Sequence, residues 1–193
     1  MSFFSSSSNG GPGDGGAAAG AARGEEAWDG GPVDGAEVTR TAAAPPAAVW
    51  AVLADGWLYA NWVVGASRIR DVDASWPQSG ARIHHSVGVW PALIDDSTRV
   101  LAAVTERELV LQARAWPAGE AVVRIVLEPE SGGRTILRMT EDAAAGPGRV
   151  IPHPVRQALI VPRNRESLLR LCLLAQGRPD DLLDPARRRG ELR

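Results

Sequence analysis

The sequence predicts a single α+β domain, in which a curved antiparallel sheet of six to seven strands wraps around a long C-terminal helix, with one or two short helices after the first strand. Three observations predict it. A short helical segment stands near the front, some six strand-like runs follow it, and a strongly apolar helix comes last. The gaps between the runs are short, so neighbouring strands are antiparallel, because a parallel crossover needs a dozen or more residues. Such an arrangement encloses a hollow suited to an apolar small molecule.

The front of the domain is predicted as strand, helix and a second short helix. The first strand is Glu37–Ala43. The first helix is Pro45–Ala54, where two prolines occupy the first turn and the apolar residues fall at helical spacing on one side. The compact segment Trp57–Trp62 predicts a further short helix.

Six more strands are predicted from alternation of apolar and polar residues, with glycine or proline between most of them. They are Ala66–Asp73, Ala81–Trp90, Ser97–Thr105, Glu108–Trp116, Ala121–Glu128 and Arg134–Glu141. One register is apolar and is expected to face the core. It contains Ile83, His85, Val87, Val89, Thr98, Val100, Ala102, Val104, Leu109, Leu111, Ala113, Ala115, Val123, Ile125, Leu127, Leu137 and Met139. The opposite register is rich in arginine, as a solvated face would be.

The closing helix is predicted within Val155–Gln176, and its last stretch is too apolar to face only water. Pro162 is expected either to bend this helix or to start its final segment. Gly177 ends it, with a proline shortly beyond. His153 stands between two prolines and is predicted to lie in a loop.

Composition indicates where the domain begins and ends and in which cellular compartment the protein is expected. Residues 36–177 are predicted to form the domain, 1–35 a disordered Gly/Ala/Ser-rich arm, and 178–193 a flexible Arg-rich tail. The N-terminus has no secretory leader and Cys172 is the only cysteine, which favours a cytoplasmic location. No segment reaches the roughly 18 consecutive apolar residues of a membrane span, so stable membrane insertion is not expected.

Charge and residue usage exclude several functions. The net charge of −2 leaves no basic footprint for nucleic acid. All 21 basic residues are arginine, which excludes Schiff-base lysine chemistry and a Walker phosphate loop. The adjacent His84 and His85 point to opposite faces of a strand and cannot jointly hold a metal. We expect no metal and no cofactor.

Three segments resemble a known superfamily. They are Val38–Asp55, Gly80–Gly88 and Arg163–Leu171. They are similar to the SRPBCC superfamily of START-related, birch-pollen-allergen-like proteins, and most of all to its polyketide cyclase/dehydrase branch. The resemblance covers about residues 36–177. It implies the helix-grip fold, with a hydrophobic cavity between the sheet and the C-terminal helix, and it does not supply a reaction.

Candidate ligand contacts follow from the residues that would line such a cavity. The aromatic residues can orient a flat ligand, and Trp57, Tyr59 and Trp62 would form a gate beside the front helix; ordinary packing is the alternative. The predicted ligand-binding set is Trp57, Tyr59, Trp62, His85, Val87, Trp90, Leu111 and Met139. Arg163 is one of four arginines that could anchor a carboxylate.

Candidates for proton transfer are His85, Tyr59 and Glu141. His85 shares its register with apolar neighbours and so points inward, where it would either act as a base or be a satisfied core histidine. Glu141 shares the register of Leu137 and Met139, and would either lie at the cavity rim or end its strand in solvent.

Two functions therefore stand ahead of the rest. The first is binding of a hydrophobic small molecule such as a lipid, isoprenoid or polyketide-like compound. The second is an aromatase/cyclase-type enzyme that uses the same cavity. An interaction module built on the arm and tail is a third possibility, and the sequence leaves protein partners open.

Overall fold

The computed structural model describes residues 30–87, 94–115 and 119–177. Its elements follow one another as β1 (Val38–Ala42), α1 (Pro46–Leu53), η1 (Gly56–Leu58), α2 (Tyr59–Trp62), β2 (Ala66–Val72), β3 (Arg82–Val87), β4 (Ile94–Val104), β5 (Glu108–Ala115), β6 (Gly119–Glu130), β7 (Arg134–Ala145), η2 (Pro147–Val150) and α3 (His153–Gln176). The predicted order of elements is confirmed.

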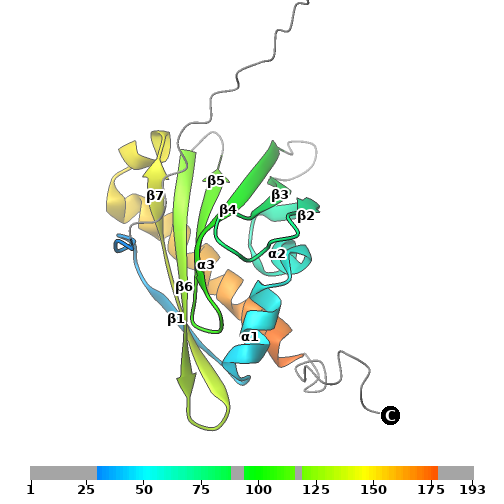
Figure 1. The fold of residues 1–193 in the computed structure, drawn as a ribbon. Coiled ribbons are helices and arrows are strands. Elements are labelled where there is room, and N and C mark those ends of the chain that lie inside the picture. Colours follow the sequence, from blue (N-terminus) through cyan, green and yellow to red (C-terminus); the bar gives the residue numbers. More distant parts are fainter. Residues whose placement is uncertain (1–29, 88–93, 116–118, 178–193) are drawn as a thin grey trace, which may run out of the picture.

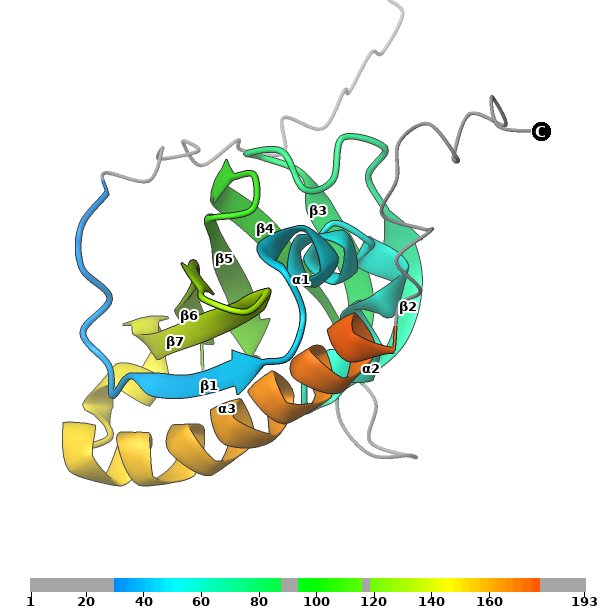
Figure 2. The same ribbon diagram turned by 90° about the horizontal axis from the view of Figure 1, so that it is seen from below.

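The seven strands form one antiparallel sheet in the order β1-β7-β6-β5-β4-β3-β2. The sheet curves, and α3 runs along its open side beside β1, while α1 and α2 lie on the same side of the sheet (Figures 1 and 2). α3 packs against β1, β7, α1 and α2. This is the helix-grip architecture that the sequence predicts.

The core lies between the concave face of the sheet and the inner sides of α1 and α3. Most residues of the predicted inward register are buried there, and α1 contributes Val49, Val52 and Leu53. The apolar end of α3 also packs inward through Leu168, Leu171, Cys172 and Ala175. Burial of these apolar side chains is the main driving force that holds the sheet and the helices together.

The predicted register is wrong at the end of β4. A bulge lies between Val100 and Ala102, where the pairing with β5 shifts. A bulge inserts one residue and exchanges the two faces of the strand beyond it. Ala103 therefore packs against the core in place of Ala102, and Val104 turns outward with 48 % of its surface exposed.

α3 begins earlier than predicted, and His153 is its first residue instead of lying in a loop. The ring of His153 bonds the Asp34 carbonyl oxygen at 3.2 Å. Pro162 neither starts a new segment nor ends the helix, which runs continuously through it. Pro162 lies on the exposed side of α3, where water can solvate the carbonyl that has lost its amide partner.

The first turns of α3 are tied to β7 by a polar cluster. Arg156 donates two hydrogen bonds to the Asp142 carboxylate, Nε to Oδ1 at 2.5 Å and Nη2 to Oδ2 at 2.8 Å. Gln157 donates to the Glu141 carbonyl oxygen at 3.2 Å and accepts from the Ala36 amide at 3.0 Å. These bonds fix the segment of α3 that precedes the cavity-lining residues.

One buried hydrogen bond joins the segment before α1 to the start of β7. Thr135 Oγ1 donates to the Ala44 carbonyl oxygen at 2.7 Å, and Thr135 is fully buried. Thr135→Val leaves that carbonyl without a partner, so we expect a loss of about 1 kcal/mol in the free energy of unfolding. Urea unfolding measures it, with the exposed Thr39→Val on β1 as the control; equal stabilities would refute this role.

Some predictions fall on residues outside the described ranges. They concern most of the N-terminal arm (1–29), the C-terminal tail (178–193), and Val89 and Trp90 at the end of the predicted third strand. Within the described residues, no helix has the length and apolar character needed to cross a membrane.

Candidate functional site

A cavity of about 100 Å³ lies between the concave face of the sheet and the middle of α3. Its wall is mostly apolar, with polar and charged side chains contributed by both the sheet and the helices. It is lined by Tyr59, Trp62, Val63, Val64, Gly65, Ala66, His85, Val87, Leu111, Ala113, Arg114, Ala121, Val123, Met139, Glu141, Arg163, Asn164 and Ser167. The expected hollow is therefore present, and it is small.

Three buried polar side chains form a hydrogen-bonded row at one end of this cavity. Thr98 Oγ1 lies 2.9 Å from Tyr59 Oη and 2.9 Å from His85 Nε2. Tyr59 comes from α2, whereas His85 and Thr98 are diagonal neighbours on the paired strands β3 and β4. The Tyr59 and His85 rings lie 5.3 Å apart between centroids. A proton can be shared along this row because the threonine hydroxyl both donates and accepts.

Burial sets the ionisation of the two ends of the row. It lowers the pKa of His85 below its ordinary 6.5, although the negative charge of Asp96 acts in the opposite direction. It raises the pKa of Tyr59 to about 12, although the hydrogen bond between Tyr59 and Thr98 acts in the opposite direction. At neutral pH the site therefore presents a neutral imidazole and a neutral phenol.

An ion pair also lines the cavity. Glu141 on β7 is buried and accepts a short hydrogen bond from Arg163 Nη2 on α3, whose side chain is 40 % exposed. Of the two positions that the sequence left open for Glu141, the structure has the one at the cavity, and its strand continues to Ala145 instead of ending in solvent. A buried carboxylate is tolerated here because the guanidinium compensates its charge.

Two atoms on the cavity wall are buried and have no hydrogen-bond partner among the described residues. They are His85 Nδ1 and Asn164 Nδ2. An unpartnered buried donor costs free energy, so such atoms mark positions where a ligand or water is expected to bind. Asn164 Nδ2 can only donate, which calls for an acceptor on the bound molecule.

The structure gathers most of the predicted site residues around one space. Tyr59, Trp62, His85, Val87, Leu111, Met139 and Glu141 all line the cavity. Trp57 does not belong with them: it lies on η1 with 59 % of its surface exposed. Trp57 therefore cannot form the predicted gate with Tyr59 and Trp62, because η1 and α2 turn Trp57 outward and Tyr59 inward.

Sequence reasoning did not assign a role to Thr98, Asn164 or Ser167. Thr98 belongs to the predicted inward register, and a polar residue among inward apolar residues could have indicated a role in the site. Asn164 and Ser167 lie three residues apart on the buried side of α3, and they interrupt a helix whose other buried positions are mostly apolar. Ser167 Oγ accepts from the Val64 amide at 3.2 Å, so part of this polarity is structural.

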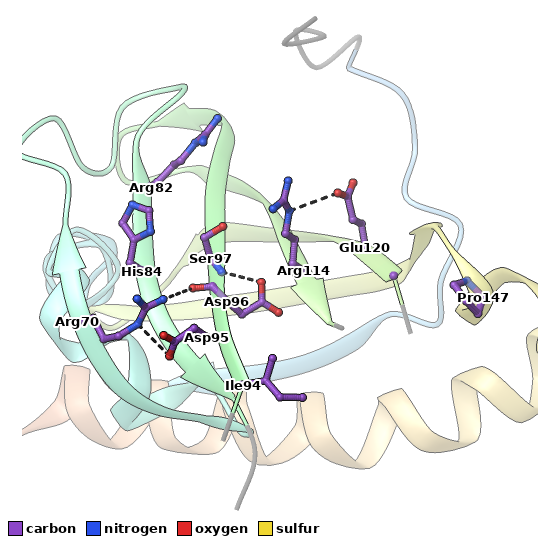
Figure 3. A pocket seen from close by; sticks show the side chains of 11 residues that line it. Arg70, Arg82, His84, Ile94, Asp95, Asp96, Ser97, Arg114, Glu120 and Pro147 are labelled. Atoms are coloured by element: carbon purple, nitrogen blue, oxygen red, sulfur yellow. Dashed lines mark hydrogen bonds and ion pairs between the residues drawn. The ribbon is translucent and has the colours of Figure 1, made fainter. Parts of the chain in front are cut away.

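A second, larger hollow of about 910 Å³ adjoins the first, and Arg114 borders both. It is lined mostly by polar and charged side chains from β2, β3, β4, β5 and β6 (Figure 3). Arg70 Nε lies 3.4 Å from Asp95, and Arg114 Nε lies 3.5 Å from Glu120. Because these charges pair with one another, the open hollow is less suited to an apolar ligand than the inner cavity is.

Among the described residues, no group of three or more histidine, cysteine or acidic side chains is placed to hold a metal ion. Cys172 is buried in the core, and burial raises the pKa of its thiol. The described side chains around the cavity offer hydrogen bonding and proton transfer by the neutral Tyr59 and His85, beside the Glu141–Arg163 ion pair.

Comparisons with solved structures support the fold. The protein CV1439 from Chromobacterium violaceum is 18 % identical, with a TM-score of 0.55 over 74 % of this chain and 98 % of that one. The Zhui aromatase/cyclase from Streptomyces sp. R1128 is 20 % identical, with a TM-score of 0.56 over 73 % of this chain and 92 % of that one. Ara h 8.0201 is 13 % identical, with a TM-score of 0.50 over 74 % and 97 %.

At these identities the structural likeness establishes the fold alone. No curated protein matches the chain. The family described as polyketide cyclase/dehydrase and lipid transport matches residues 35–171, which include every described element except the last turn of α3. The chain belongs to this polyketide cyclase/dehydrase and lipid-transport family, within the SRPBCC superfamily.

Proposed function

We propose that the protein binds a small hydrophobic molecule in the cavity between the sheet and α3, and that this molecule carries a hydrogen-bond acceptor. The observation that carries the proposal is the unpartnered, buried Asn164 Nδ2 on the wall of an otherwise largely apolar hollow. A ligand acceptor would satisfy that donor, and apolar contacts with Val87, Leu111 and Met139 would supply most of the affinity.

The size of the cavity limits which part of the ligand it encloses. An apolar cavity of about 150 Å³ holds one benzene molecule, and this one measures about 100 Å³. In its present shape it therefore accommodates the end of a chain or another group smaller than a benzene ring. A lipid, isoprenoid or polyketide-like ligand would place only one end of the molecule inside the cavity.

Asn164→Leu tests the proposal. We expect this variant to bind an apolar fluorescent probe bearing a ketone about tenfold more weakly, because it loses the donor. Its free energy of unfolding should stay equal or rise, since an unsatisfied buried group has been removed. Titration with the ketone probe and with its hydrocarbon analogue measures the effect, and Arg170→Leu on the exposed side of α3 is the control. Equal loss of both probes, or no loss, would count against a donor at Asn164.

Ligand identity requires protein from its own host. Native mass spectrometry followed by organic extraction should recover a compound with an apolar group and a carbonyl, carboxylate or other acceptor. Recovery of bare protein that also fails to bind apolar probes would refute the binding function.

The row of Tyr59, Thr98 and His85 favours a second candidate, an aromatase/cyclase-type enzyme. A neutral imidazole can accept a proton while the phenol donates a hydrogen bond to a carbonyl oxygen. Holding a reactive chain in the cavity would itself lower the barrier. Once a substrate is known, Tyr59→Phe and His85→Ala should each reduce kcat by about 100-fold, with ligand affinity little changed. Unchanged turnover in both variants would leave binding as the function.

A further inference from the structure

The start of α3 and the short helix before it carry an exposed apolar surface. Val150 is 85 % exposed, Ile151 38 %, Val155 54 % and Leu159 68 %. α3 forms the outermost layer of the molecule, so within the described residues no element covers this side of it (Figure 2). Large apolar side chains gathered in one place at this exposure indicate a contact surface. We call these four residues the η2–α3 surface.

The helical geometry separates this surface from the cavity. Val155 and Leu159 are four residues apart and therefore lie on one side of α3. The buried residues Gln157 and Asn164 lie on the opposite side. The exposed apolar residues are therefore free to contact a partner while the inner side of the same helix stays in the core.

The chain segment that carries the η2–α3 surface is basic. Residues 143–165 contain four arginines and no acidic residue. Two of these arginines are paired, Arg156 with Asp142 and Arg163 with Glu141. Arg149 and Arg165 are exposed and have no carboxylate partner among the described residues.

The remaining charged groups near this surface do not reverse its sign. Glu166 is paired with Arg170 at 2.8 Å. Asp34 is exposed beside the start of α3, where its carbonyl oxygen contacts the His153 ring. The surface is therefore apolar at its centre and basic at its edges.

We propose that the η2–α3 surface docks the protein reversibly on an anionic lipid bilayer. An apolar helix face bordered by arginines is the pattern of helices that lie in the membrane interface, with the apolar residues among the acyl chains and the cations at the headgroups. The surface is too short to span the bilayer, so contact is confined to one leaflet. The inference goes beyond ligand binding and does not depend on it.

The charge distribution favours a bilayer over a second copy of the chain. A two-fold symmetric contact would place the same surface on both copies. It would bring Arg149 and Arg165 of each copy close to those of the other, which costs free energy. An anionic membrane instead neutralises both arginines.

Vesicle sedimentation of the full chain tests the proposal. We expect binding to vesicles of phosphatidylcholine containing phosphatidylglycerol, and much weaker binding to pure phosphatidylcholine or at high ionic strength. Leu159→Asp should weaken binding by roughly tenfold or more, and the double variant Arg149→Ala/Arg165→Ala by more than tenfold. Val104→Asp, an exposed apolar position at the end of β4, is the matched control and should bind like the wild type. Absence of binding, or equal binding by Leu159→Asp, overturns the proposal.

A fluorescent label on the η2–α3 surface distinguishes binding of a bilayer from coverage of the surface by the chain itself or by a second copy. Leu159→Cys accepts an environment-sensitive fluorophore, because the natural Cys172 is buried. Its emission should shift to the blue only when anionic vesicles are added. A blue shift without vesicles in dilute protein means that the chain itself covers the surface, and overturns the proposal. A vesicle-free dimer that Leu159→Asp dissociates assigns the surface to a second copy and also overturns it.

Discussion

Val123→Trp is expected to abolish ligand binding, with at least a 100-fold loss of affinity for an apolar probe. Val123 lies on β6 and lines the cavity. An indole is larger than a benzene ring, which itself needs about 150 Å³, so the introduced side chain fills a hollow of about 100 Å³. Binding is lost because the ligand and the indole compete for one space, whatever the chemistry of the ligand.

The neighbouring residue on the same strand supplies the control. Val122 points to the other face of the sheet, since successive side chains of a strand alternate, so Val122→Trp should bind the probe like the wild type. Overpacking costs about 1–3 kcal/mol, and circular dichroism with thermal unfolding shows whether Val123→Trp remains folded. Ala113→Leu, a smaller intrusion into the same cavity, should weaken binding in proportion to its size. Full binding by folded Val123→Trp would place the ligand elsewhere on the molecule.

The sequence predicted the fold well because the fold depends on signals that are local and redundant. Alternation along β5, β6 and β7 repeats the same inward register many times, and short gaps leave only an antiparallel order of strands. The bulge in β4 departs from this regularity, and the prediction missed it. A bulge depends on how β4 and β5 pair, and neither strand alone shows it.

The site was predicted only in part, because it depends on contacts between distant residues. Alternation pointed His85 and Glu141 inward, and the structure agrees. It could not show that Arg163, 22 residues along the chain from Glu141, compensates that carboxylate. Nor could it show that Thr98 joins Tyr59 to His85, or that the cavity is as small as it is, since the free volume is what remains after all the side chains have packed.

Arg156→Ala is expected to lower the thermal unfolding midpoint at pH 7 by about 5–10 °C. The two side chains of the Arg156–Asp142 pair are only 13 % and 11 % exposed. Removing the guanidinium leaves a poorly solvated carboxylate without its cation and also loosens the first turns of α3. Arg170→Ala, which breaks an exposed pair on the same helix, should change the midpoint by less than about 2 °C. Equal shifts in the two variants would mean that the buried pair does not hold α3 in place.

The Arg156–Asp142 pair also predicts that the free energy of unfolding depends on pH, and the pKa shift of Asp142 gives the direction. Burial alone would raise the pKa of this carboxyl, but the hydrogen bonds from Arg156 and the Ala143 amide outweigh burial and hold it below its ordinary 3.8. A carboxylate whose pKa is lower in the folded state stabilises the protein above its unfolded pKa, and this contribution is lost as pH falls through the folded pKa. Asp142→Asn should therefore be less stable than the wild type at pH 5–7, and the difference should shrink below about pH 4. Urea unfolding across this range measures the difference. A gap that stays constant with pH would show that the ionisation of Asp142 is not coupled to folding, and that the pair acts through its geometry alone.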